Sequence, residues 1–363
     1  MQHMLQMNKR IEYIDAIRGV TMILVVFSHI VVLCYNTKDL GTFNSVFINF
    51  RMPLFYFISG WVMYKSNWVW NLHTILTFFK KKFKVLLVAT TIFWAIYNIY
   101  SYGTIHDEAF NSFKSGYWFT FTLFEFFCIY VITICICKGL HLKSKIEDFI
   151  IVIAGIFIYL VSSYYMHTYM WNKKPIDNTI MILMDYAGVF HWRYFLFFCI
   201  GSLIKKHLEV FHSLTDKNGV IALIVISFFI FVLFSNKIVI LPHFYVPVTL
   251  SYSLLGILVI YTFFRKNAKQ ISKEKKIGRV LQFIGTRTID IYFIHYFFLP
   301  KNLQVLGEVF IDNHNPSIEF FVTLAISMMV IAISLTIGSV IRLSPFLAQN
   351  LFGAKPIEQV TSK

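Results

Sequence analysis

The chain has 363 residues, of which 57% are hydrophobic and 14% are charged, and its formal net charge is +15. Because soluble globular domains are about one-quarter charged, this composition excludes an ordinary soluble domain. The apolar residues form blocks of about twenty, the length with which a helix spans the hydrocarbon core of a bilayer. We therefore predict an all-α, multi-pass membrane protein.

Ten apolar blocks are predicted to be transmembrane helices. In chain order they cover residues 11–35, 43–64, 84–102, 117–137, 147–166, 190–204, 219–236, 244–264, 281–300 and 318–342. With a cytoplasmic N-terminus, the inside segments hold 22 of the 33 lysines and arginines and the outside segments hold six. This ratio obeys the positive-inside rule, so it predicts that both termini are cytoplasmic. It also explains the positive charge without a nucleic-acid partner.

The chain is interpreted as a single transmembrane domain, residues 1–363, with a core of about 11–343 and no appended soluble domain. The expected location is the cell (inner, or cytoplasmic) membrane, with lipids around the helices. The five cysteines lie in or beside apolar blocks without the spacing of zinc ligands, so we expect no metal. The oligomeric state is left open.

The first predicted helix carries ionisable side chains within the stretch IDAIRGVTMILVVFSHI, residues 14–30. A charged side chain at the bilayer centre costs about 2.5–3.5 kcal/mol, so such residues are functional candidates. Arg18 and His29 are eleven residues apart, which on a helix means roughly the same face and about 16 Å of rise. Asp15 precedes Arg18 by one turn, a spacing suited to an ion pair.

These residue types suggest a particular chemistry. An arginine near the cytoplasmic side can bind phosphate as a two-pronged donor, and a neutral imidazole can take a proton near pH 7. A donor with an anionic head and a long flexible arm, such as a coenzyme A thioester, could span the distance between them. The alternative is that Asp15 and Arg18 form only a structural ion pair and His29 only hydrogen-bonds a neighbouring helix.

The spacing of Arg18 and His29 resembles the signature of the acyltransferase-3 family of integral membrane acyltransferases. Further segments resemble motifs of that family and follow in the expected order along the chain. They are RMPLFYFISGWVMY (51–64), FFKKKFKVLL (78–87), the less specific GYWFTFTLF (116–124) and IGTRTIDIYFIHY (284–296).

The resemblance implies transfer of an acyl group, usually acetyl, from cytoplasmic acyl-CoA to a hydroxyl of a carbohydrate at the outer side. Acetyl-CoA would be the donor substrate, and a lipid-linked or surface polysaccharide would be the acceptor. His29 would be the general base or would position the reacting groups, and Arg18 would contact the donor. Direct transfer and a covalent intermediate both remain open.

The basic segment departs from the family pattern, because lysines replace both of its arginines. Two alignments with the motif are possible. Lys81 and Lys84 keep the spacing of three residues, whereas aligning Lys82 with the first arginine would place Val85 at the second position. Lysine attracts phosphate as a point charge, so all three lysines are candidate donor-binding residues. The alternative is that the run only anchors the helix end at the cytoplasmic surface.

Other polar residues of the apolar blocks have two interpretations each. His295, one turn after Tyr292, either shares a cavity with His29 or hydrogen-bonds a neighbouring helix. Arg287 either pairs internally with Asp290 or binds the donor.

Glu125, on the fourth predicted helix, either assists a histidine or, as we prefer, pairs with Arg51 or Arg193. Asp185, His191 and Arg193 form a further candidate site for the acceptor.

Two rival functions remain at this level. One is a transporter or flippase of a saccharide or small metabolite, because buried ionisable groups also suit transport. The other is an inactive family member that serves as a partner in a polysaccharide synthesis complex, which the lysine substitutions leave open.

Overall fold

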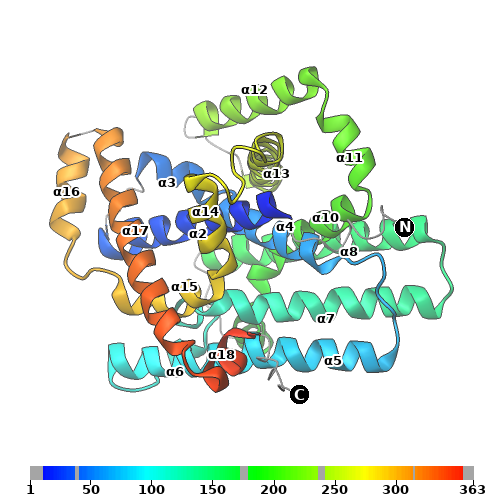
Figure 1. Cartoon of the computed structure of the whole chain (residues 1–363), viewed down its shortest axis with the longest axis horizontal. Helices are drawn as coiled ribbons and strands as arrows, with labels where there is room; N and C mark the ends of the chain where they lie inside the picture. Colours follow the sequence, from blue (N-terminus) through cyan, green and yellow to red (C-terminus); the bar gives the residue numbers. More distant parts are fainter. Residues whose placement is uncertain (1–10, 37–40, 172–178, 236–241, 314, 355–363) are drawn as a thin grey trace, which may run out of the picture. The chain divides into compact units, whose positions relative to one another are not determined.

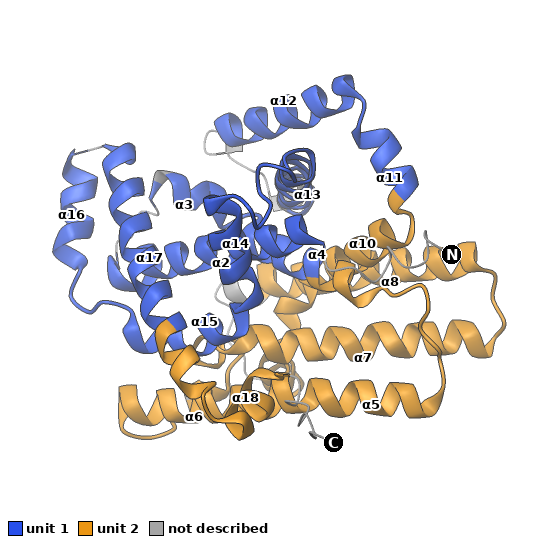
Figure 2. Cartoon of the chain, viewed as in Figure 1, with its two compact units in different colours: residues 1–58, 209–335 blue, residues 59–208, 336–363 orange. Residues whose placement is uncertain are grey.

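The computed structural model describes residues 11–36, 41–171, 179–235, 242–313 and 315–354. These residues form helices, turns and loops, and the described ranges contain no strand. The chain divides into two compact units (Figure 2). Unit 1 comprises residues 1–58 and 209–335, and unit 2 comprises residues 59–208 and 336–363.

Unit 1 is built around the first helix, α2, which continues beyond His29 as a π-helical turn over Ile30–Cys34. Its helices are α2 (Glu12–His29), α3 (Thr42–Phe47), the start of α4 (Arg51–Met63), α11 (Leu208–Thr215), α12 (Asn218–Ser235), α13 (Pro242–Lys266), α14 (Lys276–Thr286), α15 (Thr288–Ile294), α16 (Gln304–Asn313) and most of α17 (Pro316–Ile341). In Figure 1, α14 lies against α2, consistent with their many contacts.

Unit 2 begins at Ser59 with the end of α4, and it contains a long continuous helical segment from Leu72 to Tyr102. Its helices are α5 (Leu72–Lys82), the π-helical turn Phe83–Val88, α6 (Ala89–Tyr102), α7 (Trp118–Gly139), α8 (Ser144–Tyr165), α9 (Thr179–Tyr186), α10 (Phe195–Lys206) and α18 (Pro345–Phe352). Gly60 permits a close backbone approach in this unit, because a Cβ there would lie 1.9 Å from the carbonyl oxygen of Phe198.

The all-α, multi-pass prediction is confirmed. Seven helices in the described ranges are long and apolar enough to cross a membrane, and two bent pairs raise the number to nine. The pairs are Thr179–Tyr186 with Val189–Lys206, bent by 52°, and Leu208–Thr215 with Asn218–Phe234, bent by 80°. The terminal residues 1–10 and 355–363, on which the predicted cytoplasmic termini depend, lie outside the described residues.

The predicted ninth helix, residues 281–300, is divided in the structure. Helix α14 ends at Thr286, Arg287 has non-helical angles (φ −115°, ψ 21°), and α15 begins at Thr288. Asp290 lies in the first turn of α15, where a carboxylate is favoured by the helix dipole. The segment thus contains a new helix start that apolar periodicity did not reveal.

Helix α14 approaches α2 so closely that only glycine fits at two positions. A Cβ on Gly19 would lie 2.0 Å from the carbonyl oxygen of Leu281, and one on Gly285 would lie 1.8 Å from that of Asp15. Small residues commonly permit such backbone contact between membrane helices. The contact fixes α14 beside the stretch of α2 that carries Arg18.

Candidate functional site

Helix α2 positions Arg18 and His29 three turns apart without a break, which corresponds to about 16 Å of rise. Arg18 Nη2 donates a hydrogen bond to Thr288 Oγ1 at 3.0 Å, and His29 Nδ1 lies 3.0 Å from His295 Nε2. Both side chains therefore face the same neighbouring segment, as their spacing predicts.

Arg18 also pairs with Asp15, with 3.7 Å between Nη1 and Oδ1. The Asp15 side chain is 6% exposed, whereas that of Arg18 is 27% exposed. The predicted ion pair is thus present, and it leaves part of the guanidinium side chain accessible. An ion pair and an anion-binding role are therefore compatible for Arg18.

The two histidines lie side by side. Their rings are nearly parallel, at 7°, with centroids 5.2 Å apart. His295 is fully buried, and its Nδ1 lies 2.8 Å from the carbonyl oxygen of Ile291. The hydroxyl of Tyr296 lies 3.4 Å from His29 Nε2. His295 does hydrogen-bond a neighbouring helix, and its partner there is His29 itself.

Two further features surround His29. The helix changes from α to π geometry directly after it, and π-helical turns often occur at functional sites. Arg51 Nη1 donates to the carbonyl oxygen of Val25, one turn before His29, at 3.4 Å, and the charge of Arg51 acts on His29. Sequence reasoning missed Arg51 as a neighbour of His29. Its signal was an arginine directly before the apolar run of α4.

Arg287 pairs with Asp290, as one of the two interpretations predicts. Nη1 of Arg287 lies 3.1 Å from Oδ2 of Asp290, whose side chain is fully buried, whereas that of Arg287 is 28% exposed. Tyr292 is buried, with its ring centroid 6.5 Å from that of His295. The buried carboxylate of Asp290 thus has its counter-charge on Arg287, the residue directly before α15.

The lysine run belongs to unit 2, at the end of α5. Lys81 and Lys84 are exposed, whereas Lys82 is half-buried and its Nζ lies 4.5 Å from the ring centroid of Phe127. Val85 is buried. Lys81 and Lys84 are thus the exposed members of the run, whereas Lys82 lies on an aromatic ring and Val85 is buried.

Glu125 has a different partner from the arginine that we preferred. The indole Nε1 of Trp192 donates a hydrogen bond to Oε2 of Glu125 at 2.7 Å, and the charge of Lys114 also acts on the carboxylate. Burial lowers the pKa of Lys114, although the charges of Glu125 and Asp185 oppose that shift. The preference failed because the 3-10 turn Val189–Tyr194, directly before α10, presents the indole of Trp192 to α7.

Of the three residues of the candidate acceptor site, Asp185 and His191 are linked by hydrogen bonds through Ser112. The Ser112 hydroxyl donates to the carboxylate and to the carbonyl of Asp185, and His191 Nε2 donates to the Ser112 carbonyl at 3.2 Å. The His191 ring stacks on Trp118, with centroids 3.6 Å apart. Arg193 instead donates to the hydroxyl of Tyr194 at 2.9 Å. Asp185 and His191 thus meet through Ser112, whereas Arg193 has another hydrogen-bond partner.

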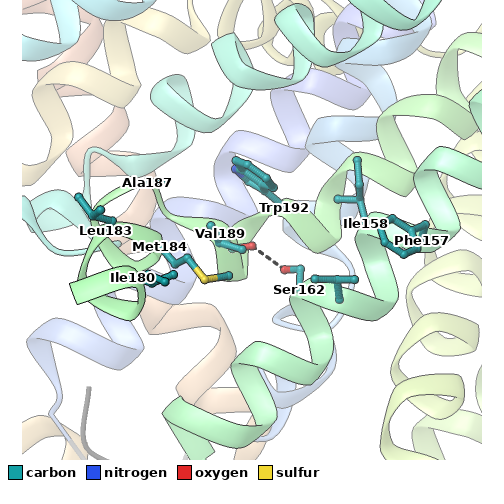
Figure 3. Close-up of a pocket in the computed structure, with 10 residues that line it drawn as sticks. Phe157, Ile158, Ser162, Ile180, Leu183, Met184, Ala187, Val189 and Trp192 are labelled. Atoms are coloured by element: carbon teal, nitrogen blue, oxygen red, sulfur yellow. Dashed lines mark hydrogen bonds between the residues drawn. The ribbon is translucent and has the colours of Figure 1, made fainter. Parts of the chain in front are cut away.

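Unit 2 also contains a pocket of about 410 Å³ between α8, α9 and the turn before α10 (Figure 3). Its lining is apolar apart from Ser162, whose hydroxyl donates to the carbonyl of Val189 at 2.7 Å, and the indole of Trp192. The lining therefore offers no cation to the phosphates of a donor. No group of three or more histidine, cysteine, aspartate or glutamate side chains in the described ranges could hold a metal ion.

Fold and site together define a multi-pass membrane protein with an arginine and a histidine on one face of its first spanning helix. The family model Acyl_transf_3, described as an acyltransferase domain, matches residues 11–337. The chain therefore belongs to the acyltransferase-3 family, which confirms the resemblance of its motifs and supports acyl transfer at the membrane. No curated protein and no solved structure matches it.

Proposed function

We propose that the protein transfers an acyl group, most simply acetyl, from cytoplasmic acyl-CoA to a hydroxyl of a carbohydrate. The acceptor is a lipid-linked or surface polysaccharide, and the protein acts in the inner (cytoplasmic) membrane as a single transmembrane domain with both termini in the cytoplasm. The family match supports acyl transfer, and the excess of lysine and arginine in the predicted inside segments supports the topology.

The observation that carries this proposal is the shared orientation of Arg18 and His29. Both contact residues 288–295, and they are about 16 Å apart along α2. In the proposal, Arg18 binds the anionic head of acyl-CoA while the flexible arm extends along α2 toward His29. Lys81, Lys82, Lys84 and Arg287 supply further positive charge for the donor, and Lys81 and Lys84 are the exposed members of the run.

The reaction follows from these positions. Neutral His29 removes the proton from the acceptor hydroxyl as that oxygen attacks the thioester carbonyl carbon. The carbon–sulfur bond breaks, the ester forms, and coenzyme A leaves as a thiolate toward the cytoplasm. The proton on His29 then passes to the thiolate or to solvent, which restores the neutral imidazole. General base catalysis of this kind contributes about 10²–10⁴-fold to a rate.

The test uses inverted membrane vesicles from cells that make both the protein and their surface carbohydrate. Radiolabelled acetyl-CoA is added outside, and label in the carbohydrate fraction is counted. His29→Gln is expected to lower incorporation at least about 100-fold, whereas His106→Gln, a change at an exposed loop histidine, is expected to leave it unchanged. Near-normal incorporation by folded His29→Gln protein would end the assignment of His29 as the base.

A separate measurement addresses the donor. A ligand that binds only the folded state raises the melting temperature, so acetyl-CoA is expected to stabilise the purified wild-type protein against heat. Arg18→Ala is expected to weaken that stabilisation. A transporter of saccharides, the rival function, would show no such response to acetyl-CoA.

A further inference from the structure

The hydrogen bonds around the histidine pair determine which ring nitrogen of His29 is basic. They can be followed from the carbonyl oxygen of Ile291, which lies 2.8 Å from Nδ1 of His295. A carbonyl oxygen can only accept a hydrogen bond, so Nδ1 of His295 carries the hydrogen. A neutral imidazole has one N–H and one lone pair, so Nε2 of His295 is an acceptor.

The neutral form is the one that the surroundings of His295 favour. His295 begins the 3-10 turn His295–Phe298, which follows α15, and it is fully buried. Burial of a charge without close compensation is costly. The acceptor Nε2 of His295 faces Nδ1 of His29 at 3.0 Å. Nδ1 of His29 therefore carries the hydrogen of this contact, and its lone pair lies on Nε2.

We propose that His295 is a positioning residue, which holds His29 in the tautomer with the lone pair on Nε2 and so makes Nε2 the atom that takes the proton of the acceptor. This inference rests on the proposed role of His29 as the base. The same contact persists when His29 becomes protonated, because Nδ1 still donates to His295 as Nε2 gains its hydrogen. The division of labour resembles that of a catalytic triad, in which a third group orients the histidine.

Tyr296, the residue after His295, contacts the ring nitrogen of His29 that carries the lone pair. The hydroxyl of Tyr296 lies 3.4 Å from Nε2 of His29, where it donates a hydrogen bond to the lone pair. Successive residues, His295 and Tyr296, therefore contact the two different nitrogens of His29. In the reaction, the acceptor hydroxyl would take the place of the Tyr296 hydroxyl at Nε2.

Two variants of His295 separate the hydrogen bond from the space that the ring fills. In His295→Gln, the side-chain carbonyl oxygen can accept from Nδ1 of His29, much as Nε2 of histidine does. In His295→Leu, no acceptor remains. We expect His295→Gln to keep at least one-tenth of wild-type turnover. For His295→Leu, turnover should fall roughly 100-fold while the KM for acetyl-CoA stays within about twofold.

A spectroscopic measurement tests the tautomer without any turnover. In protein labelled with ¹⁵N-histidine, protonated and unprotonated ring nitrogens have distinct chemical shifts, and the His29 signals are those that His29→Gln removes. We expect a protonated Nδ1 and an unprotonated Nε2 in the wild type and in His295→Gln, and loss of this preference in His295→Leu. If the leucine variant does not fold, the wild-type and glutamine spectra still decide the tautomer.

The outcomes separate the two proposals. An unprotonated Nδ1 on His29 in the wild type would overturn the inference even if His29→Gln is inactive. Wild-type turnover in folded His295→Leu would overturn it as well. Conversely, a protonated Nδ1 together with full activity of His29→Gln would leave the tautomer correct and remove the role of His29 as the base.

Discussion

The contact between α2 and α14 provides a stability prediction that depends on no assumption about the reaction. In Gly19→Ala, the new Cβ would lie 2.0 Å from the carbonyl oxygen of Leu281, where ordinary contact begins at 3.4 Å. The helices would have to separate locally by about 1.4 Å, the difference between these two values. Overpacking of this kind costs about 1–3 kcal/mol, whereas alanine itself favours a helix over glycine by only about 0.5–1 kcal/mol.

The assay heats detergent-solubilised protein and measures the monodisperse fraction that remains. Gly219→Ala is the matched control, because no atom lies within 4 Å of its new Cβ. We expect Gly19→Ala to melt several degrees lower than Gly219→Ala, which should equal or exceed the wild type. Gly285→Ala should behave like Gly19→Ala, and the double variant should lose less than the sum because both changes open one contact. Equal melting of Gly19→Ala and Gly219→Ala would refute the close packing of α14 on α2.

Three more predictions concern polar side chains. Glu125→Gln should keep the melting temperature within about 1 °C of the wild type, because an amide oxygen still accepts from Trp192. Glu125→Leu should lower the melting temperature. Equal melting temperatures of the two variants would contradict this hydrogen bond. Asp290→Ala should destabilise the folded protein by up to about 3 kcal/mol. This cost is below the range for a fully buried ion pair because Arg287 is partly exposed. An unchanged melting curve would count against the ion pair. Arg18→Lys should raise the KM for acetyl-CoA about tenfold with little change in turnover, since lysine lacks the two-pronged geometry. An unchanged KM would exclude a two-pronged contact between Arg18 and the donor.

The sequence predicted the helices well because their signal is local. Apolar blocks of about twenty residues indicated helical segments that the structure contains, including α7 (Trp118–Gly139) and α17 (Pro316–Ile341). Spacing also predicted the Asp15–Arg18 pair, because residues three apart are neighbours on one helix. The Arg287–Asp290 pair, one of two interpretations, joins the residue before α15 to the first turn of that helix.

The hydrogen-bond partner of Glu125 could not be predicted from local spacing or charge. Opposite charge favoured an arginine, but the partner is the indole of Trp192, 67 residues away. Which side chain a distant turn presents to α7 depends on the packing of α8 and α10 rather than on any local pattern. The sequence did not predict the division of the ninth segment at Arg287, because apolar periodicity continues through this break in the helix.

By itself, the sequence determined that this is a helical membrane protein and that Arg18 and His29 share a face of its first helix, since composition and the helical repeat act within short stretches of chain. Only the tertiary structure decided that His29 meets His295, 266 residues further on. The contact depends on glycines that bring α14 against α2 and on the helix start after Arg287. Backbone approach and the choice of hydrogen-bond partner arise only when distant segments pack together.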